Sequence, residues 1–405
     1  MSDVVDRPVY YDPFDFEIDD DPYPTWKRLR DETPLYFNDK YGFYALTRYD
    51  DVSAGLHNWD TFRSGKGTVL DIILSGMQVP PGLVLFEDPP LHDVHRKLLS
   101  RVFTPRRMVA IEPLARKFTT AALDALEDAD RFDFIEHLGA WMPMRTIGTL
   151  LGIPEADHTV LRDGTDKFLA LEQGEHQRPP SAQRRQVFIV PNYENIAEYV
   201  DWRADHPCDD LMSELIHVEF EDLDGTRRKL TRAEVLTYIS TVMGAGSETT
   251  TRLIGFSGQL LGDNPDARRA LASDHSLIPV AIEEVLRYQA PSPVQARYVE
   301  HDVTYYGDTV AAGSIMLLVN GAANRDERKF PEPDRFDVFR ERNAHLSFGQ
   351  GLHFCLGAAL ARMEARVAIE EVLKRWPNWD VDYAHATMAH TSSVRGWASL
   401  PVQIT

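Results

Sequence analysis

The sequence predicts a mainly α-helical protein with a minor β region, folded as a single domain over residues 1–405. From residue 104 onward, apolar residues recur with the helical period of 3.6 over long stretches. Alternating patterns typical of strands are short and broken by glycine. The chain contains no internal repeat, low-complexity tract or long Gly/Ser linker, which favours one large domain over several small ones.

The first hundred residues contain two predicted elements and one unusual segment. The sequence predicts a short strand at 43–47 and a helix that begins at Asp50 or Asp51. The segment 66–87 is strongly apolar, yet glycines and prolines interrupt it too often for a long helix. We therefore expect an apolar loop in this region.

The middle of the chain is predicted to be helical from 104 to 176, with breaks at 152–154 and at Gly174. A polar break at 177–185 precedes another helix, which continues to about Ala204.

A long helix is predicted to begin after Thr231, because Thr231 and Glu234 have the spacing of a capping box. It ends at Gly262, ahead of Pro265. Since this helix is apolar on nearly all sides, we expect it to cross the centre of the protein. Later elements are a helix at 277–288, short strands within 297–320, and a final helix from 355 to 377.

The composition excludes two classes of function. The chain has 43 Lys and Arg against 63 Asp and Glu, a net charge of −20, so it lacks the basic footprint of a nucleic-acid-binding protein. No apolar run approaches the roughly 18 residues of a membrane-spanning helix, and we expect no membrane anchor. The acidic, proline-rich start lacks the features of a signal peptide, and two cysteines cannot form a disulfide framework. We therefore expect a cytoplasmic protein.

Cys355 lies in the glycine-rich stretch FGQGLHFCLG, where the final helix is predicted to begin. Helical N–H groups at that position favour a thiolate. Taken alone, the residues leave four alternatives: a buried apolar cysteine, a nucleophile with His353 as base, a zinc ligand, or part of a dinucleotide-binding loop. Further ligands at zinc spacing are absent, and no strand–turn–helix unit surrounds the glycines.

The order F-G-x-G-x-H-x-C-x-G is far more specific than its parts, and it resembles the haem-binding loop of the cytochrome P450 superfamily. The resemblance implies the P450 fold, with haem b as cofactor and Cys355 as its axial thiolate ligand. It also assigns Phe348, Gly349 and Gly357 to the cofactor loop.

The stretch AGSETT, within the long helix, resembles the oxygen-activating segment of the same family. Its hydroxyl side chains can bond backwards to carbonyls and weaken the helix there. The resemblance implies that Glu248 and Thr249 form the catalytic acid–alcohol pair, and that Ala245 lies beside the haem and the substrate.

Two further sets of charged residues fit the pattern. The pair Glu284 and Arg287 has i,i+3 spacing, which by itself indicates an exposed ion pair, but E-x-x-R in the family is buried, and Arg335 is expected to join it. The resemblance further implies that the haem propionates are bound by cationic donors. These donors are His92, Arg96, Arg297 and His353.

The resemblance implies a monooxygenase that inserts one oxygen atom of O2 into a hydrophobic small molecule, by hydroxylation or epoxidation. A separate ferredoxin with its reductase would supply the electrons, and the enzyme is expected to be a monomer. A peroxide-driven haem enzyme and a non-catalytic haem-binding protein are the alternatives.

The residues expected in the substrate pocket are Ile72, Ile73, Leu85, Ala245, Val294 and Val394. The basic patch expected to receive an acidic ferredoxin comprises Arg101, Arg106, Arg107 and Arg366.

Overall fold

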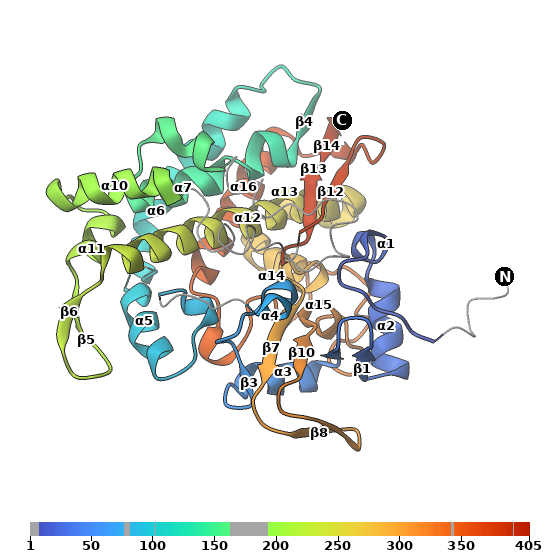
Figure 1. Ribbon diagram of the computed structural model, residues 1–405. Coiled ribbons are helices and arrows are strands. Elements are labelled where there is room, and N and C mark those ends of the chain that lie inside the picture. Colours follow the sequence, from blue (N-terminus) through green and yellow to red (C-terminus); the bar gives the residue numbers. More distant parts are fainter. Residues whose placement is uncertain (1–7, 77–81, 102, 163–192, 342–343, 392) are drawn as a thin grey trace, which may run out of the picture.

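The computed structural model describes residues 8–76, 82–101, 103–162, 193–341, 344–391 and 393–405. Helices make up most of this part of the chain, and the strands gather in small sheets, as the sequence predicted (Figure 1). The breaks expected at Gly174 and at 177–185 lie outside the described residues.

The helices form most of the upper half of Figure 1. The α-helices are α1 (Phe16–Asp20), α2 (Tyr23–Glu32), α3 (Tyr49–His57), α4 (Leu70–Ser75), α5 (Leu91–Ser100), α6 (Pro105–Asp124), α7 (Met142–Leu151), α10 (Tyr193–Asp205), α11 (Leu211–His217), α12 (Arg232–Asp263), α13 (Pro265–Ser273), α14 (Ile278–Tyr288), α15 (Asn320–Ala323) and α16 (Ala358–Arg375). Shorter turns are η1 (Val84–Phe86), the π-helical η2 (Phe134–Gly139), η3 (Glu155–Asp157), η5 (His275–Leu277) and η6 (Gly351–His353).

The largest sheet has five strands in the order β1-β2-β10-β7-β3. Strand β10 pairs with β2 in parallel and with β7 in antiparallel orientation, so segments about 270 residues apart lie side by side. The strands are β1 (Leu35–Asn38), β2 (Phe43–Leu46), β3 (Phe62–Arg63), β4 (Arg131–Asp133), β5 (Glu219–Glu221), β6 (Arg227–Lys229), β7 (Gln295–Val299), β8 (Val303–Tyr305), β9 (Asp308–Val310), β10 (Ile315–Leu318), β11 (Trp379–Val381), β12 (Thr387–Ala389), β13 (Gly396–Ser399) and β14 (Pro401–Ile404).

Helix α12 crosses the middle of the molecule, as its apolar surface predicted (Figure 1). The capping box is present: the Thr231 hydroxyl accepts a hydrogen bond from the Glu234 amide at 3.2 Å, and the Glu234 carboxylate accepts one from the Thr231 amide at 2.7 Å. The helix packs against α7, α16 and η2, and against strand β13. It also contacts α14, and α14 and α16 carry Glu284, Arg287 and Arg366.

Several boundaries differ from the sequence prediction for non-local reasons. Strand β4, inside a region expected to be helical, forms because it pairs with β14 at the end of the chain. The short helix α13 begins at Pro265, where we had expected only a break. The final helix begins at Ala358, not at Cys355, so the cysteine precedes the helix by three residues.

Candidate functional site

The loop around Cys355 is a tight turn that leads into α16. The Cys355 amide donates to the Phe348 carbonyl at 2.8 Å, and the Gly349 amide donates to the Leu346 carbonyl at 2.8 Å. Gly349 and Gly351 have φ values of 66° and 67°, in the left-handed region that favours glycine. A Cβ atom on Gly351 would lie 2.7 Å from the Leu56 carbonyl of α3, so this glycine also allows the loop to pack closely.

The surroundings of Cys355 shift the pKa of its thiol in opposite directions. Burial raises the pKa of the thiol, while the amides of Gly357 and Ala358 and the nearby guanidinium groups of Arg96 and Arg362 act to lower it. Although the cysteine precedes α16, its sulfur therefore still faces the N–H groups at the start of that helix. A metal cation at the sulfur would complete the stabilisation of a thiolate.

Basic side chains from three elements gather beside this loop. His92 and Arg96 come from α5 and Arg297 from β7, while His353 is in η6; the rings of the two histidines have centroids 4.6 Å apart. The guanidinium of Arg96 donates to the Phe354 carbonyl, next to Cys355. The four residues predicted as a group are thus together in space.

This basic cluster, defined as His92, Arg96, Arg297 and His353, contains unsatisfied polar atoms. The Nε2 atoms of both histidines are buried without a hydrogen-bond partner among the described residues. Burial lowers the pKa of Arg297 to about 10, although the negative charge of Asp88 acts to raise it. The pKa of His353 is lowered to about 3, mainly by burial and further by repulsion from Arg297, His92 and Arg96. Such a cluster fits an anionic group that binds between these side chains.

At the centre of α12, hydroxyl side chains bond back to backbone carbonyls one turn earlier. The Thr249 hydroxyl donates to the Ala245 carbonyl at 2.7 Å, and Ser247 donates to Met243 at 2.9 Å. Ala245 is exposed and Thr249 is half-exposed, although the flanking residues Met243 and Ser247 are buried. This stripe of an otherwise central helix is therefore accessible at its surface, and Thr249 lies on it.

Glu248 lies on the neighbouring, buried side of α12. Its carboxylate accepts a hydrogen bond from the Arg252 guanidinium at 2.9 Å, and both side chains are largely buried. Arg252 was not among the residues predicted for the site, although its i,i+4 spacing from Glu248 indicates that the two side chains can pair.

The residues expected in the substrate pocket do not all come together. Val294 and Val394 line one pocket, together with Val69 and Leu70 from the start of α4. Ile72 and Ile73 instead pack around Gly67 and are buried or half-buried. Leu85 has 42% of its surface exposed. The structure therefore joins Val294 to Val394, whereas Ile72, Ile73, Leu85 and Ala245 do not line this pocket.

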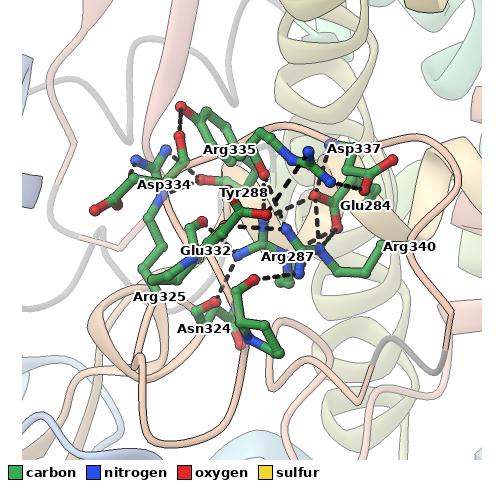
Figure 2. A network of polar contacts seen from close by, with 12 residues as sticks. Glu284, Arg287, Tyr288, Asn324, Arg325, Glu332, Asp334, Arg335, Asp337 and Arg340 are labelled. Atoms are coloured by element: carbon green, nitrogen blue, oxygen red, sulfur yellow. Dashed lines mark hydrogen bonds and ion pairs between the residues drawn. The ribbon is translucent and has the colours of Figure 1, made fainter.

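The charge network around Glu284 is buried, and Figure 2 shows its members. The Arg287 guanidinium bonds both carboxylate oxygens of Glu284, at 2.8 and 2.7 Å, and neither residue is exposed. Its remaining N–H groups donate to the carbonyls of Asn324, Pro333 and Arg335. Each charge thus has several partners, as a buried ion pair requires.

The third member of this network, beside Glu284 and Arg287, is Arg340, and the prediction of Arg335 was wrong. Arg340 Nε lies 3.1 Å from each oxygen of Glu284, whereas the Arg335 side chain points outward to Asp337 at 2.6 Å (Figure 2). Both arginines belong to the same irregular loop, and the sequence contains no periodicity there to say which one turns inward.

The basic patch predicted at Arg101, Arg106, Arg107 and Arg366 is only partly available. Arg101 and Arg106 are exposed, and no ion pair is recorded for either among the described residues. Arg107 pairs with Glu214 of α11, while Arg366 pairs with Glu112 at 2.7 Å and Glu370 at 2.9 Å. The neutralising acids come largely from other elements, which the local run of basic residues could not reveal.

Comparisons with known proteins identify the family of this chain. The sequence model of the family described as Cytochrome P450 matches residues 181–391. A relative named "Putative cytochrome P450 123", from Mycobacterium tuberculosis, is 37% identical over 99% of this chain and 98% of its own. The chain belongs to the cytochrome P450 family. The P450 monooxygenase PikC of Streptomyces venezuelae is 32% identical over 95% of this chain and 91% of its own length.

Solved P450 structures share the fold over nearly the whole chain. Cytochrome P450 CYP109Q5 from Chondromyces apiculatus superposes with a TM-score of 0.84 at 32% identity, covering 98% of both chains. P450BioI, solved with an acyl carrier protein that carries hexadec-9Z-enoic acid, has a TM-score of 0.83 at 28% identity, covering 96% of this chain and all of its own (100%).

Membership of the family establishes the class of chemistry. This P450 is an oxidoreductase, a haem monooxygenase that uses a haem iron cofactor, O2, a redox partner and a small-molecule substrate. None of the helices in the described part of the chain is long and apolar enough to cross a membrane.

Proposed function

We propose that Cys355 would bind the iron of haem b as a thiolate and that the basic cluster would bind the two haem propionates. The observation that carries the proposal is the position of that cluster beside the cysteine. Arg96 donates to the Phe354 carbonyl, and Arg297 is buried. The Nε2 atoms of His92 and His353 are buried without a hydrogen-bond partner among the described residues. Phe348, Gly349 and Gly357 shape the loop that holds the sulfur in place.

The protein's own contribution is to admit the substrate, exclude water and deliver protons. When bound, the haem supplies the activation of O2 and the transfer of one oxygen atom. On α12, the half-exposed Thr249 hydroxyl donates to the Ala245 carbonyl and can accept a proton that the buried Glu248 carboxylate, at the adjacent position, passes to it. Ala245, one turn before Thr249, leaves room because its side chain is small.

We propose a hydrophobic substrate of the size of a fatty acyl chain or a steroid, modified by hydroxylation of a C–H bond or epoxidation of a C=C bond. Val69, Leu70, Val294 and Val394 place apolar side chains along one pocket, and such side chains favour an apolar ligand. Structural relatives support this size range: P450BioI was solved with a fatty acyl carrier protein, and CYP109E1 from Bacillus megaterium was solved with corticosterone.

The electron donor we propose is a separate ferredoxin with its reductase, serving a monomeric, cytoplasmic enzyme. Its docking site would include the exposed Arg101 and Arg106, because local positive charge on an acidic protein steers an acidic partner. Both cysteines are free thiols, which suits a reducing compartment.

The experiment that tests the function begins with a spectral-shift screen of fatty acids, steroids, terpenoids and aromatic compounds. Each binding compound is then incubated with NADH, ferredoxin and reductase under ¹⁸O2, and with hydrogen peroxide alone. We expect one ¹⁸O atom in the product and NADH-dependent turnover. Turnover with peroxide but none with the NADH system would identify a peroxide-driven enzyme, and no product from any binding compound would favour a haem-binding protein without catalysis.

A further inference from the structure

The side chain of Arg252 links two parts of the site that are far apart in the sequence. One arm of its guanidinium donates to Glu248 Oε1 at 2.9 Å, and the other arm donates to the carbonyl of Trp397 in β13. Arg252 is 7% exposed and Glu248 is 4% exposed, so the pair lies in a region of low dielectric. A buried charge pair of this kind is stable only where its geometry is well defined.

Strand β13 is shaped around this arginine. Gly396, at the start of the strand, has a φ of 156°. A Cβ atom placed there would lie 2.6 Å from Arg252 Cβ and 2.8 Å from its Cδ. The strand can therefore approach the arginine this closely only because residue 396 has no side chain.

The segment that enters β13 is also the wall of the pocket. Val394 lines the pocket together with Val294, and its carbonyl accepts a hydrogen bond from Thr391 Oγ1 at 2.7 Å. The following amide, of Arg395, donates to the Pro291 carbonyl at 2.8 Å. The pocket wall is thus held in place two residues before the glycine that packs on Arg252.

The position of Arg252 on α12 determines where it can hold the acid. Residues 248 and 252 are i,i+4 and share one face of the helix, whereas Thr249 lies about 100° further round. An unrestrained glutamate samples many rotamers, so the distance from its carboxylate to the Thr249 hydroxyl varies. A proton relay requires that distance to be maintained.

We propose that Arg252 is a positioning residue, which holds the Glu248 carboxylate in place for proton delivery and ties it to the pocket wall through β13. The proposal rests on the function proposed above, in which Glu248 supplies protons to Thr249. It adds that the acid and the wall formed by Val394 are fixed to one another by a single side chain.

The first test compares coupling in the holoenzyme variants Arg252→Gln and Arg252→Lys. In Arg252→Gln, we expect product formation to fall roughly tenfold or more, since positioned proton transfer is worth about 10²–10⁴-fold. The share of electrons released as hydrogen peroxide and the solvent deuterium isotope effect should both rise. Arg252→Lys keeps the charge and should recover part of the coupling, although it cannot bond Glu248 and Trp397 with two arms.

A matched control separates positioning from loss of a buried arginine. Arg268 of α13 is 4% exposed and donates to the carbonyls of Leu261 and Trp379, with no carboxylate partner recorded among the described residues. Arg268→Gln should therefore lower the thermal midpoint without changing the peroxide share or the isotope effect. If the Arg252 variant loses stability but keeps wild-type coupling and isotope effect, as in this control, the proposal is overturned.

A second test does not depend on turnover. A double-mutant cycle in the ferric holoenzyme measures the thermal midpoint of Arg252→Gln, Glu248→Gln and the double variant. If the arginine holds the acid, removing it leaves a buried carboxylate without that partner, so the loss should be at least roughly twofold smaller when Glu248 is already glutamine. Additive losses would show that the two side chains do not hold one another.

Gly396→Ala provides an independent disturbance, because its Cβ would push on Arg252 without removing the charge. We expect Gly396→Ala to raise the peroxide share, as Arg252→Gln does, and wild-type coupling would contradict the link to β13.

The proposed function and the role of Arg252 would be contradicted by different results. If the wild-type protein forms no product, the proposed function fails while the stability cycle still tests the pair; if the wild type is active but the cycle is additive, only the role of Arg252 is lost.

Discussion

At the scale of single residues, the environments of the two cysteines are opposite. Cys355 faces the helical amides of Gly357 and Ala358 and two arginines, although burial raises the pKa of its thiol. Cys208 is exposed, and its hydrogen bond to the Asp210 carboxylate raises the pKa of its thiol. Positive surroundings stabilise a thiolate and a carboxylate opposes one, so only Cys355 is suited to bind a metal cation.

Cys355→Ser should therefore abolish the red-shifted absorption of the reduced carbonyl complex, because serine provides no thiolate ligand. Cys208→Ser is the matched control and should leave that absorption unchanged. The measurement is the difference spectrum of the reduced protein with and without carbon monoxide. The reverse pattern would contradict the assignment of the ligand.

The Thr249 hydroxyl gives a second prediction at this scale. In Thr249→Ala, substrate binding should be normal, but the share of electrons lost as hydrogen peroxide should rise severalfold because the relay lacks its hydroxyl. Ser257→Ala removes an equivalent hydroxyl on α12, which bonds the Leu253 carbonyl at 2.8 Å and is fully buried. Peroxide and product yields measured for both variants check the prediction, and equal coupling in the two would show that Thr249 has no special role.

At the scale of elements, the charge network around Glu284 connects α14 to the loop before Cys355. Glu284 and Arg287 belong to α14, and Arg340 joins them from the loop that also bonds Arg287 through its carbonyls. Removing the Arg340 side chain takes away one of the two guanidinium groups that bond Glu284, whereas Arg287 and the Asp337 amide, at 3.0 Å, stay in place. We expect Arg340→Ala to lower the free energy of unfolding by about 2–3 kcal/mol, somewhat less than for a buried charge that loses its only partner.

The neighbouring Arg335→Ala is the control, because that side chain is 59% exposed and pairs with Asp337. It should change the free energy of unfolding by no more than about 0.5 kcal/mol. Urea denaturation of both variants tests the assignment. A larger loss for Arg335 than for Arg340 would reverse it.

Helix α16 contains a buried acid with an unusual response to pH. Burial raises the pKa of Glu364 to about 8, with weak opposition from Thr146 and Thr250. In the unfolded chain, a glutamate has a pKa of about 4.3. Between these values the folded state binds the extra proton, so this residue makes the protein less stable as the pH rises from about 4.3 to 8.

Glu364→Gln should remove that dependence and raise the free energy of unfolding at pH 8 relative to the wild type. Glu371, on the same helix, is the opposite case: burial favours its neutral form, but Lys374, Arg375 and Arg116 prevail and lower the pKa of its carboxyl to about 2. Its contribution to stability is present above about pH 4.5 and is lost as the pH falls towards 2. Urea denaturation across pH 5–8 should show a changed slope in the Glu364 variant, and an unchanged slope would contradict the prediction.

At the scale of the whole molecule, charge is distributed unevenly. The chain has a net charge of −20, yet Arg101 and Arg106 are exposed at adjacent helix ends, since α5 ends at Ser100 and α6 begins at Pro105. Arg107 and Arg366 are largely neutralised by their glutamates and contribute less. Electrostatic steering of an acidic ferredoxin should therefore depend mainly on the two exposed arginines.

The double variant Arg101→Glu, Arg106→Glu should slow reduction by ferredoxin roughly tenfold at low salt, because rim charges act on the association rate. Reduction by dithionite should be unaffected. In the wild type, the rate with ferredoxin should fall as salt is added, since the Debye length is about 8 Å at physiological ionic strength. A rate that is independent of both salt and the two arginines would remove this surface from the electron-transfer route.

The sequence by itself determined the features that depend on local chemistry. The order of residues around Cys355, the capping box at Thr231 and the apolar surface of α12 require only neighbours along the chain, and the family comparison agrees with the first of these. The fold class followed from periodicity for the same reason.

Only the tertiary structure decided which distant side chains meet. It selected Arg340 over Arg335, paired Arg107 and Arg366 with acids from other elements or turns, and placed Arg252 between Glu248 and β13. Strand β4 exists because β14 pairs with it, 270 residues later in the chain. These contacts depend on how elements pack, and loop residues without periodicity carry no local signal of the direction in which their side chains will point.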